Sequence, residues 1–244
     1  MRSLNRRPPS KLWILFPLAF YTALNIALIF VDIWLWPPES PVLQALHDTL
    51  VHVVSLTVFV AVVSRLWGLR EAGVRLEGLG RSFKLSLLAV PSIIAVFALL
   101  YLVVSATGVS PELKVGVSTL SSFFLALPTW IIAGFEEELS MRCIVQRVAE
   151  ERWGAKAGIL VSTLYFIALD SFGLHFVVTL MLLGLGPAFY RFRMPLTSLV
   201  VSLVFAYAYH KTRNVLGPAL VHALIDIGQG AVGVTLLLLG VVGQ

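Results

Sequence analysis

The sequence predicts an all-α integral membrane protein: a polytopic bundle of seven or eight transmembrane helices with an intramembrane polar cavity. Of its 244 residues, 58% are hydrophobic and 13% are charged, whereas soluble domains carry about 25% charged residues. Its mean hydropathy is +0.91. Runs of about 20 apolar residues recur along the chain, which is the length a helix needs to cross a bilayer. Only helices and closed β-barrels span membranes. These runs lack the alternation of apolar and polar residues that barrel strands show, so the spans are predicted to be helices.

Eight apolar runs are expected to span the membrane. They are Leu12–Trp34, Leu46–Leu66, Phe83–Ala106, Thr119–Phe135, Ala157–Gly173, His175–Tyr190, Leu196–Tyr209 and Leu216–Val242. The first is too long for the apolar core of a signal peptide and is interpreted as a retained span. The run His175–Tyr190 could be short or re-entrant, and glycines after Gly228 could split the last run. No repeat or soluble domain is evident, so residues 1–244 form a single domain.

Lysine and arginine indicate the orientation. They are frequent in the N-terminal segment, in the loop Arg65–Lys84 and in the stretch Arg142–Lys156. These parts are expected to be cytoplasmic, with the protein in a prokaryotic cytoplasmic membrane. Further along the chain, Lys211 and Arg213 would lie on the outer side of the membrane if every apolar run crosses it. The net charge of +5 is spread over short loops beside spans, which favours contact with anionic lipid over nucleic-acid binding.

A charged cluster follows the fourth apolar run: Glu136, Glu137, Glu138 and Arg142. Ionisable groups in or near a bilayer are costly, so they suggest a functional site. Glu138 and Arg142 are four apart and can pair on one helix face. Glu137 then lies about 100° around the helix, free to act as a general base for water. Alternatively, the cluster is the polar end of a span, reaching the headgroups.

Two further polar groups lie inside apolar runs. His222 and Asp226 share a helix face, so the carboxylate could orient the imidazole; a purely structural pair is the alternative. Asp170 stands alone in its run, with His175 five residues on, and could belong to a site or to an interhelical pair.

A last polar group, His47, Asp48 and His52, begins the second run. Two histidines and an aspartate could bind a metal, but the spacing is not a specific signature. An outer-interface location is the favoured interpretation. The one cysteine, Cys143, excludes an internal disulfide and a multi-cysteine metal site.

Three of these motifs together resemble a known family. The segment Glu137–Arg142 matches the Glu-Glu-x-x-x-Arg motif of the CAAX protease and bacteriocin-processing family of intramembrane glutamate proteases. That family has a Phe-x-x-x-His motif one helix later, where this chain has Phe166 and Asp170. It has a His-x-x-x-Asn or His-x-x-x-Asp motif near its C-terminus, matched by His222 and Asp226. The resemblance covers about residues 119–226.

The resemblance implies a catalytic set. Glu137 would activate water, the Glu138–Arg142 pair would fix the helix, and His222 would stabilise the oxyanion. Asp226 would orient His222, and Asp170 would help to position the water. No cofactor is expected. Zinc held by Glu137, Asp170 and His222 is possible but not favoured, since no His-Glu-x-x-His is present.

The departure from the family is Asp170, which stands where the family has histidine. Asp170 could serve as a second carboxylate, His175 could reach in from a turn later, or proteolysis could be lost. The expected depths also differ. Glu137 is expected near the cytoplasmic end of its span, and Asp170 about 21 Å into its own. Their convergence requires a tilted helix or a cavity that enters from the cytoplasmic side.

Three functions follow, from different classes. The favoured one is an intramembrane endopeptidase that acts on a membrane-embedded or membrane-adjacent peptide or protein. The second is a catalytically silent relative that binds or escorts a membrane peptide. The third is a small proton-coupled transporter, which the absence of repeats and split helices argues against. The substrate and the oligomeric state are left open.

Overall fold

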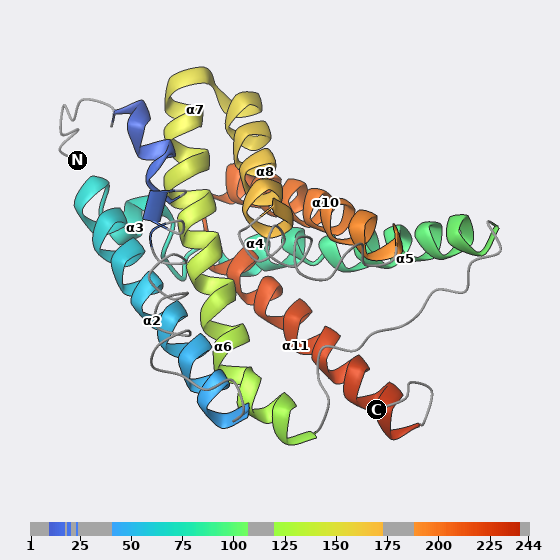
Figure 1. Cartoon of the computed structure of the whole chain (residues 1–244). Helices are drawn as coiled ribbons and strands as arrows, with labels where there is room; N and C mark the ends of the chain where they lie inside the picture. The colour runs from blue at the N-terminus through green and yellow to red at the C-terminus, as the bar shows by residue number, and fades with distance from the viewer. Residues whose placement is uncertain are drawn as a thin grey trace.

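The described part of the chain is helical throughout its regular elements (Figure 1), which confirms the predicted all-α fold class. The computed structural model describes residues 10–17, 19, 20, 23, 41–106, 120–172 and 188–239. Most of the expected spans Leu12–Trp34 and His175–Tyr190 lies outside these residues, and so does the choice between seven and eight spans.

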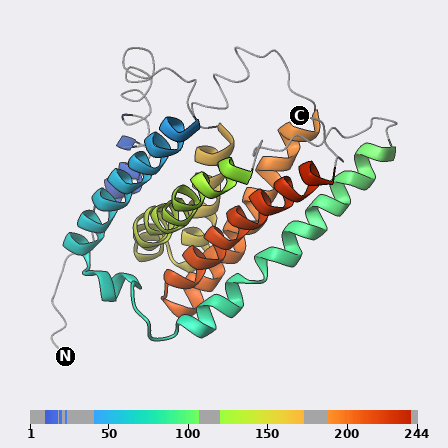
Figure 2. The same ribbon diagram turned by 90° about the horizontal axis from the view of Figure 1, so that it is seen from below.

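The helices have the following bounds. They are η1 (Lys11–Ile14), α2 (Pro41–Leu66), α3 (Leu69–Ala72), α4 (Leu79–Ser86), α5 (Ala89–Ala106), α6 (Leu120–Glu138), η2 (Leu139–Gln146), α7 (Arg147–Trp153), α8 (Ala155–Phe172), α10 (Ala188–Thr212) and α11 (Leu216–Leu238). In Figure 2, α2 and α5 form opposite edges of the bundle, and α6, α8, α10 and α11 lie between them.

The outer surface of the bundle is apolar. Two segments, Ala45–Leu66 and Leu79–Leu99, are long and apolar enough to cross a membrane. Leu50 and Ile94, on these segments, are 62% and 63% exposed, as expected of side chains that face lipid. The protein is therefore an integral membrane protein. The last run is not split at Gly228, because α11 continues through it to Leu238.

The charged cluster lies inside one continuous helical column. The helices α6, η2 and α7 follow one another without a break from Leu120 to Trp153. The helix therefore continues past Phe135, where the apolar run ends. Glu137 lies near the middle of the column, about 25 Å from Gly154 at 1.5 Å per residue, and not near the cytoplasmic end as expected.

A tight turn at Gly154 folds α8 back along this column. Its φ of 84° lies in the left-handed region, which glycine adopts most easily. Residues at equal distances from the turn then face one another across the hairpin. The pairs in contact are Glu150 with Gly158, Gln146 with Ser162, and Arg142 with Phe166. Asp170 lies one turn beyond Phe166 on α8.

A close crossing brings α11 against α6. A Cβ atom on Gly134 would lie 2.8 Å from the backbone nitrogen of Ala223 and 3.0 Å from the carbonyl oxygen of Ala219. No side chain larger than that of glycine fits there without a shift of the backbone. One turn further along α6, this crossing sets Glu137 and Glu138 beside His222.

The basic segments gather at one end of the bundle. Arg147 Nη1 donates to the carbonyl oxygen of Glu71 at 2.6 Å, and Arg213 forms an ion pair with Glu150. The loop after α2, the end of α7 and the end of α10 therefore lie together. Lys211 and Arg213 were expected on the other side only if every run spans; Arg213 instead lies beside Glu150, so these basic residues gather at one end of the bundle.

The crossing yields a prediction for Gly134→Ala. Alanine is the better helix former, yet its Cβ would collide with backbone of α11, so we expect a loss of about 1–3 kcal/mol, typical of overpacking. Thermal unfolding in detergent measures this loss of stability. Gly228→Ala is the matched control, since its Cβ meets no atom within 4 Å and should leave stability equal or higher. Equal melting temperatures for both variants would contradict the close crossing.

Candidate functional site

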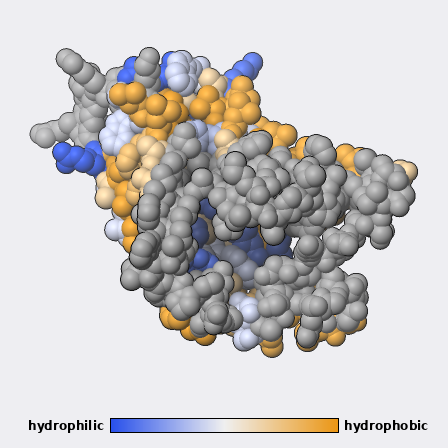
Figure 3. Space-filling view, in the orientation of Figure 1, coloured by the Kyte–Doolittle hydropathy of each residue, from blue (hydrophilic) through white to orange (hydrophobic). Residues whose placement is uncertain are grey.

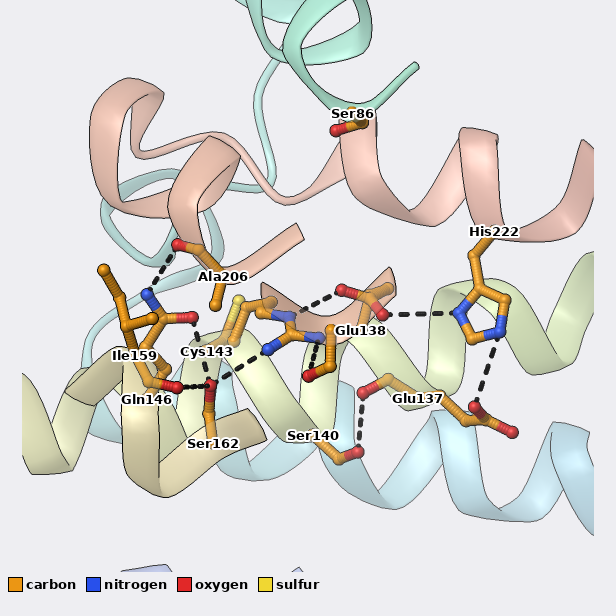
Figure 4. A network of polar contacts seen from close by, with 12 residues as sticks. Ser86, Glu137, Glu138, Ser140, Cys143, Gln146, Ile159, Ser162, Ala206 and His222 are labelled. Carbon is orange, nitrogen blue, oxygen red and sulfur yellow. Dashed lines mark hydrogen bonds and ion pairs between the residues drawn. The ribbon is translucent and has the colours of Figure 1, made fainter. Parts of the chain in front are cut away.

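A fully buried ion pair forms the centre of the site. Arg142 Nε donates to Glu138 Oε2 at 2.7 Å, and both side chains have no exposed surface. The other guanidinium nitrogens donate to Ser162 Oγ at 2.9 Å and Ser202 Oγ at 3.0 Å. The predicted pair is therefore present. The alternative, a polar helix end among lipid headgroups, does not hold for this pair, because both side chains are completely buried within the protein. Figure 4 shows Glu138 pointing toward His222.

The imidazole of His222 is held by the same carboxylate. Its Nδ1 lies 3.3 Å from Glu138 Oε1, so one oxygen of Glu138 contacts arginine and the other contacts histidine. The rings of Phe166 and Phe205 lie 5.9 and 5.8 Å from the imidazole centroid. The position expected for Asp226, at the orienting nitrogen, is thus occupied by Glu138.

The second imidazole nitrogen faces two partly exposed carboxylates. His222 Nε2 lies 3.7 Å from Glu137 Oε2 and 3.8 Å from Asp226 Oδ2. The side chains of Glu137 and Asp226 are 35% and 27% exposed. Both separations exceed hydrogen-bonding distance and are too short to admit an atom directly between the nitrogen and a carboxylate oxygen; a water at one side can contact both. The three predicted motif residues Glu137, His222 and Asp226 therefore converge.

Residues 119–228 match the family model described as type II CAAX prenyl endopeptidase Rce1-like. These residues form an Rce1-like domain. The resemblance to the CAAX protease and bacteriocin-processing family is thereby confirmed. The matched range agrees closely with the residues 119–226 expected from the motifs. No curated protein and no solved structure matches the chain.

The Rce1-like domain opens on one face of the molecule. Figure 3 shows a hollow there, over the region where α6 and α11 lie, with hydrophilic side chains visible within it. The exposure of the site residues agrees with such an opening. Glu137 and Asp226 retain accessible surface, whereas Glu138 and Arg142 have none. Water can therefore reach the outer carboxylates but not the ion pair.

A π-helix follows the glutamates of the domain directly. It comprises Leu139–Gln146, and all of its residues are buried. Segments with i→i+5 bonding are rare and occur frequently at functional sites. Ser140 Oγ donates to the carbonyl oxygen of Glu137 at 2.8 Å, which satisfies an acceptor at the start of the altered pattern. No sequence signal that we used predicts this segment.

Polar contacts continue from the ion pair to the basic end of the bundle. Ser162 Oγ lies 3.5 Å from Gln146 Oε1, and Gln146 Nε2 donates to Glu150 Oε1 at 2.9 Å. His210 Nδ1 lies 3.1 Å from the same Glu150 oxygen. Sequence reasoning missed Ser162 and Ser202 as partners of Arg142, and Gln146 as a partner of Ser162. Their one signal was the occurrence of serine and glutamine in otherwise apolar helices.

The third glutamate of the cluster has its partner on α2. His52 Nδ1 lies 2.8 Å from Glu136 Oε2, so His52 lies against α6 and contributes to no local metal group with His47. His47 Nδ1 lies 3.3 Å from Asp48 Oδ1 instead. Over the ranges given above, no set of three or more His, Cys, Asp or Glu side chains is arranged to hold a metal ion.

Two predicted residues are only partly testable. Asp170 belongs to α8, but its side chain lies outside the described residues, and His175 lies wholly outside them. The three interpretations of Asp170 therefore stay predictions: a second carboxylate, a replacement by His175, or a loss of proteolysis.

The ion pair yields a prediction for Arg142→Leu. The change would leave Glu138 buried without its cation, and breaking a buried pair in this way costs about 3–5 kcal/mol. The matched control is Arg70→Leu, which removes the exposed Arg70–Glu77 pair and should cost less than about 1 kcal/mol. Denaturant or thermal unfolding in detergent compares them. Similar losses in both variants would show that Arg142 is not a central support.

Proposed function

We propose that the protein is an intramembrane endopeptidase that hydrolyses a peptide bond with a water activated by Glu137. One observation carries the proposal. Of the three consecutive glutamates, Glu137 has the side chain that reaches solvent and faces the Nε2 nitrogen of His222. Glu136 and Glu138 are completely buried. A base must reach both its water and the substrate, and Glu137 meets that condition.

The residues support the following steps. A water between Glu137 and the peptide carbonyl gives its proton to the Glu137 carboxylate, and its oxygen bonds to the carbonyl carbon. In the doubly protonated imidazole, Nδ1–H is donated to Glu138 and Nε2–H to the oxyanion. The carbon–nitrogen bond then breaks, and Glu137 transfers the proton to the leaving amine. No covalent intermediate with the protein is formed.

The remaining motif residues have supporting roles in this proposal. The Glu138–Arg142 pair fixes His222 and the turn of α6. Asp226 borders the Nε2 nitrogen from α11 and helps to hold the substrate amide or the imidazole. Asp170, which stands at the second-motif position on α8, helps to position the water. The steps need no metal; if zinc is used, Glu137, Asp170 and His222 are the candidate ligands.

The substrate is a membrane-embedded or membrane-adjacent peptide or protein, in this proposal. The depth of Glu137 in the α6 column supports it, because a peptide bond must enter the bundle to reach the site. The basic end of the bundle is then cytoplasmic, as is the N-terminus, in a prokaryotic cytoplasmic membrane.

The substitution Glu137→Gln tests the proposal. Glutamine keeps the size of the side chain but cannot accept the proton, so cleavage should fall by about 10²–10⁴-fold. The purified protein and the variant are incubated with quenched membrane-proximal peptides. Glu151→Gln makes the same chemical change in the exposed Arg147–Glu151 pair and should cleave normally.

Two further outcomes sharpen this test. A zinc chelator should leave the rate unchanged, and a loss restored by zinc would replace the metal-free scheme. Cleavage that survives in Glu137→Gln would exclude Glu137 as the base. The replacement of the second-motif histidine by Asp170 favours a second candidate, a silent relative that binds a membrane peptide. That function would bind peptides equally in both proteins and cleave none.

The orientation is tested with Trp153→Cys. Trp153 ends α7 at the basic end of the bundle and is 55% exposed, so a cysteine there should react with a membrane-impermeant maleimide. Labelling is expected in inside-out vesicles and not in intact cells. The native protein serves as the control, because Cys143 is fully buried and should not react. The opposite labelling pattern would reverse the proposed topology.

A further inference from the structure

The contact between His52 and Glu136 lies outside the motifs that define the site. His52 belongs to α2, well before the Rce1-like domain at 119–228. Its Nδ1 lies 2.8 Å from Glu136 Oε2, and the Glu136 side chain has no exposed surface. A buried carboxylate is costly unless a partner and hydrogen bonds compensate for lost hydration. His52 supplies that compensation from a separate helix.

The geometry of α6 relates this contact to Glu137. Successive residues on a helix are about 100° apart, so Glu136 and Glu138 point to different sides of the helix. Glu136 contacts α2 through His52, whereas Glu138 contacts Arg142 and, on α11, His222. Glu137 lies between two carboxylates that are both held by partners. The backbone that carries Glu137 is therefore fixed from two sides.

The pair also affects the charge around Glu137. Three consecutive glutamates bring negative groups together, and each requires a nearby donor to remain in place. Without His52, the buried Glu136 carboxylate would lose this hydrogen bond. It would then compete for the water or for donors that otherwise serve Glu137. Such competition lowers the rate of the chemical step more than it weakens peptide binding.

We propose that His52 and Glu136 form a positioning pair that holds Glu137 in its working place from the α2 side. The proposal rests on the peptidase function proposed above and adds to it a residue that no motif contains. His52 acts through Glu136 and does not touch the reacting atoms.

A second α2–α6 contact provides a matched control. Thr49 Oγ1 and Thr129 Oγ1 lie 2.7 Å apart, about two helical turns along α6 from Glu136. This contact ties the same two helices together but carries no charge and does not adjoin Glu137. Thr49→Val therefore reproduces the loss of one interhelical hydrogen bond without the proposed effect on the site.

The experiment compares kcat and KM for a peptide that the native protein cleaves. His52→Phe should lower kcat about tenfold, equivalent to about 1.4 kcal/mol, and change KM less than about twofold. Glutamine can still donate to Glu136, so His52→Gln should recover part of the lost rate. In the variant Glu136→Gln, a further His52→Phe change should cause no additional loss, because the two residues act as one unit. Thr49→Val should keep the native kcat.

Several results would overturn the pair. His52→Phe could keep the native kcat, or Thr49→Val could lower kcat as much as His52→Phe does. His52→Gln could fail to recover any of the lost kcat. In the double variant, the losses in kcat from His52→Phe and Glu136→Gln could multiply as independent effects. Glu136→Gln, a change of nearly equal size, gives the same test if His52→Phe fails to fold. Glu137→Gln is run in parallel: if it cleaves, the proposed function fails and the pair with it. If it is inactive while His52→Phe is normal, the pair alone fails.

Discussion

The buried pair of Arg142 and Glu138 is the interaction on which the rest of the structure depends. Taking two charges out of water costs several kcal/mol per ion unless the geometry is close to ideal. Here each guanidinium nitrogen has an acceptor, and Ser162 and Ser202 provide two of them from α8 and α10. The second carboxylate oxygen contacts His222 on α11. One pair thereby fixes the relative positions of four helical segments and the imidazole.

The site is a consequence of unequal burial along three consecutive carboxylates. Glu136 and Glu138 have partners and no exposed surface, while Glu137 keeps about a third of its surface accessible. The close crossing at Gly134 brings α11 near enough for His222 to face Glu137. In the proposed peptidase, this arrangement sets a rigid donor beside an accessible base, as electrostatic preorganisation requires.

Much of the fold and the site was accessible from sequence because the signals are local. Apolar length predicts membrane helices, and spacing of four predicts the Glu138–Arg142 pair. The helix continues past the end of the apolar run at Phe135, because pairing inside the protein buries the charged residues that follow. The His52–Glu136 contact joins residues 84 positions apart, and no local pattern encodes such a distance. The π-helix depends on tertiary packing in the same way.

The most direct test of the account is a crystal structure of Glu137→Gln with a peptide that the native protein cleaves. The account predicts that the scissile carbonyl oxygen lies within hydrogen-bonding distance of His222 Nε2, with the residue 137 amide facing the carbonyl carbon. The Arg142–Glu138 contact should persist unchanged in the complex. A peptide bound away from His222, or a carbonyl that faces no donor of this set, would contradict the assignment of Glu137 as the base.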